Sequence, residues 1–120
     1  MIKLFKHLSF VCAWTLLSCS VAHAESLSKA ELDLLVKEDI ATAQVLTEVC
    51  PTLIGENQKV VQHVNHFTQS NLKRLSNPAT TLAQLKQDAE YQTAYAEAKK
   101  ESLSADQAEQ KQGCEDILSL

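Results

Sequence analysis

Apolar side chains recur every three or four residues along most of the chain beyond residue 27, which is the spacing of helices with one buried face. The first helix is expected to begin at Ser28, which has the sequence of a capping box with Glu31. It is expected to end or kink at Cys50, because Pro51 disfavours helical backbone at the preceding residue. Gly55 is a natural stop shortly after. The predicted inner stripe consists of Leu32, Leu35, Val36, Ala43, Leu46 and Cys50.

The rest of the sequence predicts several more helices, in which the spacing of apolar residues is less regular. Asn57 is expected to cap the second helix, and the pair Asn77-Pro78 is expected to close it. Further capping boxes are possible at Thr81–Gln84 and Ser104–Gln107. The predicted inner positions are Val60, Val61, Val64, Phe67, Asn71 and Leu75 in the second helix, Tyr91, Ala94, Tyr95 and Ala98 in a later one, and Leu103, Gln107, Cys114, Ile117 and Leu118 in the last.

The composition favours a small all-α protein. Two glycines and two prolines among 120 residues leave room for few and short loops, which makes a turn-rich β-sandwich a poor fit. The length accommodates one domain. We therefore expect an all-α fold, a small bundle of four to five helices, with a thin core because the inner faces contain much alanine.

The first 24 residues have the pattern of a secretory signal peptide. Lys3 and Lys6 precede the apolar run Leu8–Leu17, and the segment ends in Ala22-His23-Ala24. We expect this segment to be removed on export to the periplasm, leaving residues 25–120 as a single helical domain. An alternative is cleavage before Cys19, where Leu16-Leu17-Ser18-Cys19 resembles a lipobox and the cysteine would carry a lipid anchor.

The charge of the exported part is acidic. Loss of Lys3 and Lys6 leaves nine of the 11 basic residues against 15 acidic ones, so the net charge moves from −4 to −6. A nucleic-acid partner is disfavoured, because neutralising phosphates requires a basic face. Blocks of basic residues that would mark binding to acidic membranes are absent, and the apolar run of the leader is too short for a membrane span.

Cys50 and Cys114 are the two cysteines that remain after the leader. An even number in an exported chain predicts a disulfide, which would connect the end of the first helix to the last helix and close the bundle. Two free thiols are the alternative. Neither cysteine belongs to a Cys-x-x-Cys motif, so a thioredoxin-like redox role is not expected.

Few residues in the sequence are candidates for a metal site or a catalytic site. His63 and His66 lie three residues apart on one flank of the second helix and are weak candidates for a metal site, because zinc needs a third and usually a fourth ligand. A half-exposed polar flank is the alternative. Tyr91 and Tyr95 are expected to belong to the core or to an interface. We find no motif for a catalytic nucleophile or for a cofactor, and we expect no enzyme activity.

Asp39 falls within the predicted apolar stripe of the first helix, between Leu35 and Ala43. A buried carboxyl must be paired or protonated, so Asp39 is a possible pH-responsive group with His63 as its partner. The alternative is that the stripe is narrower and that Asp39 points into water.

Two resemblances extend this interpretation. The segment Val49-Cys50-Pro51-Thr52-Leu53-Ile54-Gly55, followed by Cys114-Glu115-Asp116-Ile117-Leu118, resembles an uncharacterised family of small secreted two-cysteine helical proteins of Gram-negative bacteria. This resemblance implies a periplasmic helical domain and no assigned activity. The architecture is also similar to the periplasmic acid-stress chaperones of the HdeA type. Their first cysteine lies near the start of a helix, whereas Cys50 is predicted to end one here.

These observations favour a non-enzymatic periplasmic protein that acts through contacts with a protein partner or client, with a stress-related holdase as one specific form. The alternative is a carrier of a small ligand or a metal that uses His63 and His66.

Overall fold

The computed structural model describes residues 26–119, which form an all-α bundle with no strand in that range. The predicted signal peptide at residues 1–24 and the lipid anchor at Cys19 lie outside these residues. The helices are α2 (Lys29–Ile54), α3 (Gln58–Leu72), α4 (Leu82–Leu85), α5 (Ala89–Ser104) and α6 (Gln107–Leu118). The expected fold class, a bundle of four to five helices closed by one disulfide, is confirmed.

Helix α2 begins at the predicted capping box, in which Ser28 and Glu31 exchange side-chain and backbone hydrogen bonds. The helix passes through Pro51 and ends at Ile54, so it does not end at Cys50, whereas the predicted stop at Gly55 is confirmed. Its last turn continues because Leu53 and Ile54 pack against the apolar cluster around the disulfide, which offsets the hydrogen bond that proline cannot donate. Gly55 stops the helix at φ 78°.

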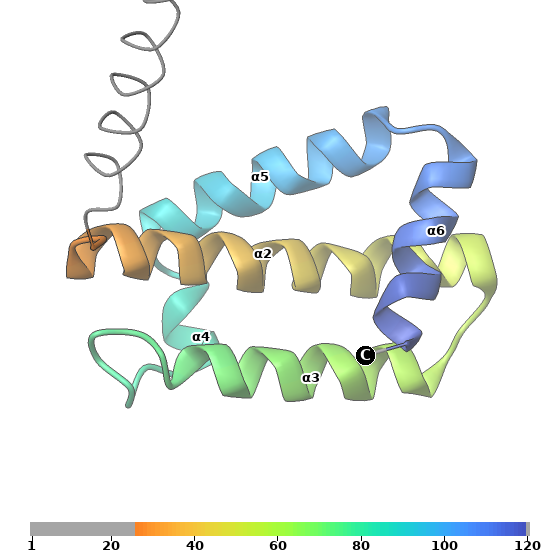
Figure 1. Ribbon diagram of the computed structural model, residues 1–120. Helices are drawn as coiled ribbons and strands as arrows, with labels where there is room; N and C mark the ends of the chain where they lie inside the picture. The colour runs from red at the N-terminus through yellow and green to blue at the C-terminus, as the bar shows by residue number, and fades with distance from the viewer. Residues whose placement is uncertain (1–25, 120) are drawn as a thin grey trace, which may run out of the picture.

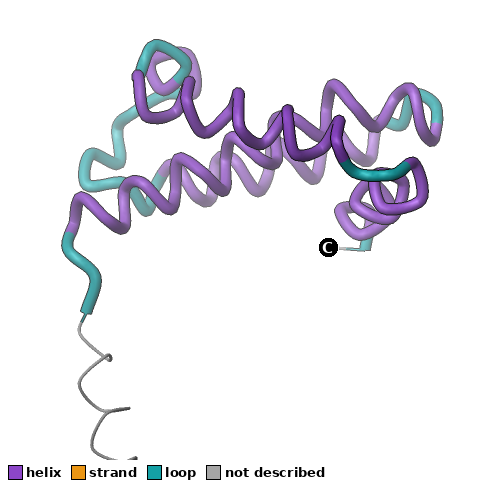
Figure 2. The backbone as a smooth tube through the Cα atoms, turned by 90° about the horizontal axis from the view of Figure 1, so that it is seen from above, coloured by secondary structure: helices purple, strands orange, loops and turns teal. Residues whose placement is uncertain are grey.

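Helix α2 is the central element, and the three longer helices that follow all pack against it (Figure 1). Helix α3 returns antiparallel to α2, whereas α5 runs in the same direction as α2 and makes its most extensive contact. Helix α6 crosses the far end of the bundle, where it packs on both α2 and α3; Figure 2 shows this crossing from above. The start of α2 lies at the opposite end of the bundle from α6 (Figure 1).

The core consists of two apolar clusters along α2. One lies where α2 meets the segment from the end of α3 to α5 and contains Val36, Ile40, Ala41, Leu72, Leu75, Leu85, Tyr91 and Ala94. The other lies where α2, α3 and α6 meet and contains Ala43, Cys50, Val60, Val64, Cys114 and Ile117. The expected positions of Tyr91 and Ala94, and of Cys114 and Ile117, are confirmed.

Several predicted inner positions are wrong. Leu32 and Leu35 are 41% and 44% exposed, because α6 reaches only the other half of α2. Val61 and Leu103 are also exposed, as is Gln107. Residues that the single predicted stripe omitted are buried instead, because neighbours contact α2 on more than one face: Ile40, Ala41, Val45 and Val49.

The capping residues of the later helices follow the prediction in part. Asn57 caps α3, and Thr81 forms the expected capping box with Gln84. Helix α6 is capped by Asp106, whose side chain accepts from the backbone of Glu109, so the box predicted at Ser104–Gln107 is wrong. Ser104 is the last residue of α5 and instead donates its hydroxyl to a backbone oxygen within that helix.

Candidate functional site

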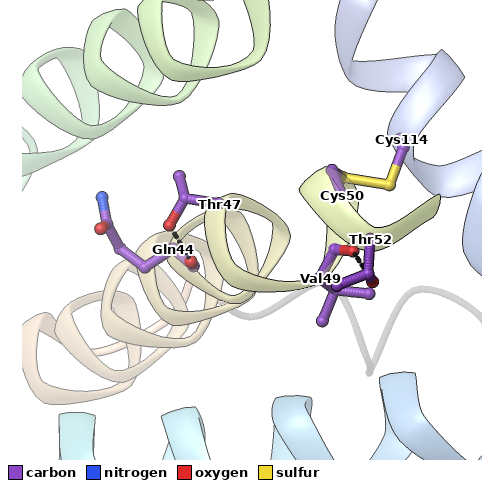
Figure 3. Close-up of a disulfide and its surroundings, with 6 residues drawn as sticks. All are labelled: Gln44, Thr47, Val49, Cys50, Thr52 and Cys114. Carbon is purple, nitrogen blue, oxygen red and sulfur yellow. Dashed lines mark hydrogen bonds between the residues drawn. A yellow bond between two sulfur atoms is a disulfide. The ribbon is translucent and has the colours of Figure 1, made fainter. Parts of the chain in front are cut away.

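The predicted disulfide is present. Cys50 near the end of α2 and Cys114 in α6 are bonded, with their Cα atoms 5.6 Å apart, and both are buried (Figure 3). The bond is surrounded by apolar side chains of the second cluster, which exclude solvent from the sulfur atoms. In this position the bond holds α6 on the central helix and has a structural role.

The structure does not bring Asp39 and His63 together. Asp39 is exposed on α2 and His63 is half-buried on α3, and no ion pair joins them within the described residues. The expectation that Asp39 lies on the buried stripe is wrong, because the next residue, Ile40, occupies the buried position. A carboxyl in water has no reason to act as a buried pH-responsive group.

His63 and His66 lie on α3, half-buried and exposed respectively. Across residues 26–119, no group of three or more His, Cys, Asp or Glu side chains is arranged to hold a metal ion. The two histidines by themselves are too few ligands for a zinc site.

A cavity of about 370 Å³, which we call the α2–α5 pocket, opens between α2 and α5. Its volume is at the lower end of the range typical of small-molecule sites. The two helices supply most of its walls, and a residue just after α4 completes them. The lining residues are Gln44, Thr47, Glu48, Lys86, Tyr91, Gln92 and Tyr95.

Glu48 is the most strongly connected polar residue of this pocket. Its carboxylate accepts hydrogen bonds from the Tyr95 hydroxyl and, at 2.9 Å, from Lys99 Nζ. These two bonds lower the pKa of Glu48 below its ordinary value, the Tyr95 bond having the larger effect. Burial, together with the same hydrogen bond, raises the pKa of Tyr95 well above its ordinary value. At neutral pH, Glu48 is therefore a charged acceptor and Tyr95 a neutral donor.

Tyr91 also lines the pocket but has no such partner. It is 3% exposed, and its hydroxyl is buried without a hydrogen bond among the described residues. Burial, and then the charge of Glu48, raise the pKa of this tyrosine. The rings of Tyr91 and Tyr95 lie 6.0 Å apart, centre to centre, and form an apolar wall. A buried hydroxyl without a hydrogen bond costs free energy.

A second group of charges attaches the start of α5 to α2. Lys37 Nζ lies 3.1 Å from Asp88 Oδ2 and 2.6 Å from Glu90 Oε2. The other carboxylate oxygen of Asp88 accepts from the backbone N–H of Tyr91 and so caps α5. That backbone bond is the largest reason why the pKa of Asp88 is lowered; burial opposes it and Lys37 adds to it.

The sequence analysis missed the α2–α5 pocket. The spacing of Tyr91 and Tyr95 correctly placed them at an interface, but nothing near Glu48 indicated its partners, which are 47 and 51 residues away. The pairing depends on α5 lying parallel to α2, and local patterns carry no such information.

The first turns of α2 expose a group of apolar side chains that we call the leucine surface. It consists of Leu32 and Leu35, which are one helical turn apart, together with Leu34 on another side of α2 and Leu27 just before the helix; in this order they are 41%, 44%, 38% and 48% exposed. These residues lie at the end of α2 that α6 does not reach (Figure 1). Exposed acidic side chains are interspersed among or next to them, namely Glu31, Glu38 and Asp39. In the part of the chain that the structure describes, no helix is long and apolar enough to cross a membrane.

Comparison with known proteins gave one finding. A family model described as "Domain of unknown function (DUF7944)" matches residues 36–117. All residues of the α2–α5 pocket fall inside the matched segment, whereas the leucine surface precedes it. No match was found among curated proteins or among solved structures.

Proposed function

Since the chain belongs to this family of unknown function, we propose that it is an exported, non-enzymatic protein that binds apolar segments of other proteins in a Gram-negative periplasm. Two features support export. The first 24 residues have the pattern of a cleaved leader, and the Cys50–Cys114 bond is of a kind that persists in oxidising compartments.

The leucine surface is the observation that carries this proposal. Each of the four leucines exposes more than a third of its surface, on neighbouring turns at one end of the molecule. Burying such side chains against a partner gains about 25 cal/mol for each Å² removed from water. A group of this kind is typical of a surface for protein contacts.

The charges around the leucine surface define the partner. Glu31, Glu38 and Asp39 are exposed beside the leucines and outnumber the exposed Lys29, so a segment with basic residues flanking an apolar stretch is the complementary occupant. A second copy of the chain would place the same carboxylates opposite one another, which costs free energy. The proposed occupant is therefore a basic, apolar segment of a different, incompletely folded protein.

A stress-related holdase is the specific form that we favour. Acid activation through Asp39 loses its basis, because this residue is exposed. The acid-sensitive groups are instead Glu48 and Asp88, which connect α5 to α2. Their protonation would loosen α5 and expose apolar residues of the first cluster.

The test is a titration of the purified, disulfide-bonded chain with a fluorescent peptide that carries lysines on both sides of a leucine-rich stretch, followed by anisotropy. We expect it to bind, and a matched peptide with glutamates in place of the lysines to bind at least about tenfold more weakly. The double variant Leu32→Ser/Leu35→Ser should lose binding by a similar factor.

The matched control is Leu103→Ser, which removes a leucine that is 62% exposed at the end of α5, away from the leucine surface. It should bind the lysine-flanked peptide as the unaltered chain does. Equal binding of the two peptides, or equal loss in both leucine variants, would contradict the proposal. Suppression of aggregation of denatured malate dehydrogenase, measured by light scattering, should follow the same order among the variants if the holdase form is correct.

A further inference from the structure

The lining of the α2–α5 pocket contains one acidic and one basic residue, so its formal charge is zero in an acidic chain. It contains one acidic residue, Glu48, whose carboxylate is already engaged by Lys99 at 2.9 Å. It also contains Lys86, which makes no ion pair within residues 26–119. The ammonium group of Lys86 is therefore available to a ligand, although its charge also acts on Glu48, whereas one carboxylate oxygen of Glu48 is already bound by Lys99.

Some hydrogen-bond donors of the pocket have protein partners and others have none. The amide nitrogen of Gln92 donates to the backbone oxygen of Lys86 at 3.0 Å, and that of Gln44 donates to Thr68 Oγ1 at 3.0 Å. Among the described residues, neither the Lys86 ammonium group nor the buried Tyr91 hydroxyl has a protein partner. An ammonium group and a hydroxyl are each suited to donate to an anionic oxygen, such as that of a carboxylate.

The remaining wall of the pocket is apolar. The rings of Tyr91 and Tyr95 lie 6.0 Å apart with their planes tilted by 31°, and both line the cavity. The volume of about 370 Å³ is suited to a compact molecule. An inorganic anion would leave most of this wall uncovered, whereas an aromatic or branched aliphatic acid would cover it.

We propose that the α2–α5 pocket binds a small organic carboxylate with an apolar body, with Lys86 as the charge partner and the Tyr91 hydroxyl as a hydrogen-bond donor. The site shares no residue with the leucine surface, so it goes beyond the proposed function and can fail independently of it.

The test uses benzoate, benzamide and benzylamine as probes of equal size and different charge. Each is titrated into the disulfide-bonded chain at low salt and followed by amide chemical shifts in two-dimensional NMR spectra. We expect benzoate to shift the amides around Lys86, Tyr91 and Gln92, and the other two probes to bind at least about tenfold more weakly. Binding of benzoate should weaken as salt is added, because the contact is charged.

Variants assign the contacts. Lys86→Gln should weaken benzoate binding by about tenfold, whereas Lys100→Gln, which changes an exposed lysine of α5 outside the pocket lining, should leave it unchanged. Tyr91→Phe should weaken benzoate binding by several-fold and raise the melting temperature of the unliganded chain, because it removes an unpaired buried hydroxyl. A purely structural role for that hydroxyl would lower the melting temperature instead.

Three results would overturn the proposal: no shifts with benzoate up to about 10 mM, tighter binding of benzylamine than of benzoate, or identical benzoate binding by Lys86→Gln and the unaltered chain. The peptide titration of the leucine surface does not depend on any of them. Loss of peptide binding with intact benzoate binding would contradict the proposed function alone.

Discussion

Glu48 connects two helices that are far apart in the sequence. One of its carboxylate oxygens accepts from the Tyr95 hydroxyl and the other from Lys99, so a single residue of α2 engages two residues of α5. Hydrogen bonds to an ionised acceptor are stronger than those between neutral groups, although both Glu48 and Lys99 are about half exposed and water screens their attraction. The Tyr95 bond is therefore the more informative contact to measure.

The titration of Tyr95 reports this contact directly. The chain contains only two tyrosines, so Tyr95 is the sole tyrosine of the Tyr91→Phe variant. We expect its ionisation, followed by ultraviolet absorbance, to occur well above the ordinary tyrosine pKa of about 10, because burial and the bond to Glu48 both favour the neutral form. Adding Glu48→Gln should move this ionisation to lower pH. An unchanged titration would show that the carboxylate does not hold the hydroxyl in solution.

At the scale of the elements, the helices and their starts were more predictable than their buried faces. The capping boxes at Ser28 and Thr81 were predicted correctly because they are local, with partners three residues apart. The exposure of Leu32 and Leu35 was not predictable, because it depends on how far α6 extends along α2. The α2–α5 pocket was not predicted either, because it depends on how α5 packs against α2.

The contact between α5 and α2 is extensive, but it combines apolar packing with polar contacts and has no covalent bond of its own. Of the three carboxylates in these contacts, Glu48 and Asp88 have pKa values below their ordinary ones. A group whose pKa is lowered on folding stabilises the folded state above its unfolded pKa. That stability is lost as the pH falls through the folded pKa.

We therefore expect the free energy of unfolding in urea to be nearly constant from about pH 7 to pH 5, and to fall between about pH 4 and pH 2. Glu48→Gln should be less stable at neutral pH and should lose less on acidification, because the amide has no charge to lose. The control is Glu97→Gln on α5, since Glu97 makes no ion pair among residues 26–119. If the free energy of unfolding changes with pH in the same way for the unaltered chain and for Glu48→Gln, this account of the contact between α2 and α5 is wrong.

At the scale of the whole molecule, the disulfide compensates for a small core. The chain has two modest apolar clusters instead of one large one, and α6 contributes little more than Cys114, Ile117 and Leu118 to the second. Without a covalent bond, the short α6 would have to stay in place through these side chains alone. The Cys50–Cys114 bond spans 64 positions and includes α3, α4 and α5 in the closed loop.

Removing this bond should therefore be the most damaging of the changes considered. The double variant Cys50→Ala/Cys114→Ala leaves no unpaired thiol in residues 26–119 and should lower the free energy of unfolding by about 4 kcal/mol, from loop closure of this length. That is a large share of the total of about 5–15 kcal/mol expected for a small domain. Urea unfolding followed by circular dichroism measures it, and reduction of the unaltered chain with dithiothreitol should reproduce the effect. A loss below about 1 kcal/mol would mean that side-chain packing alone holds α6, and that the two clusters suffice for a domain of this size.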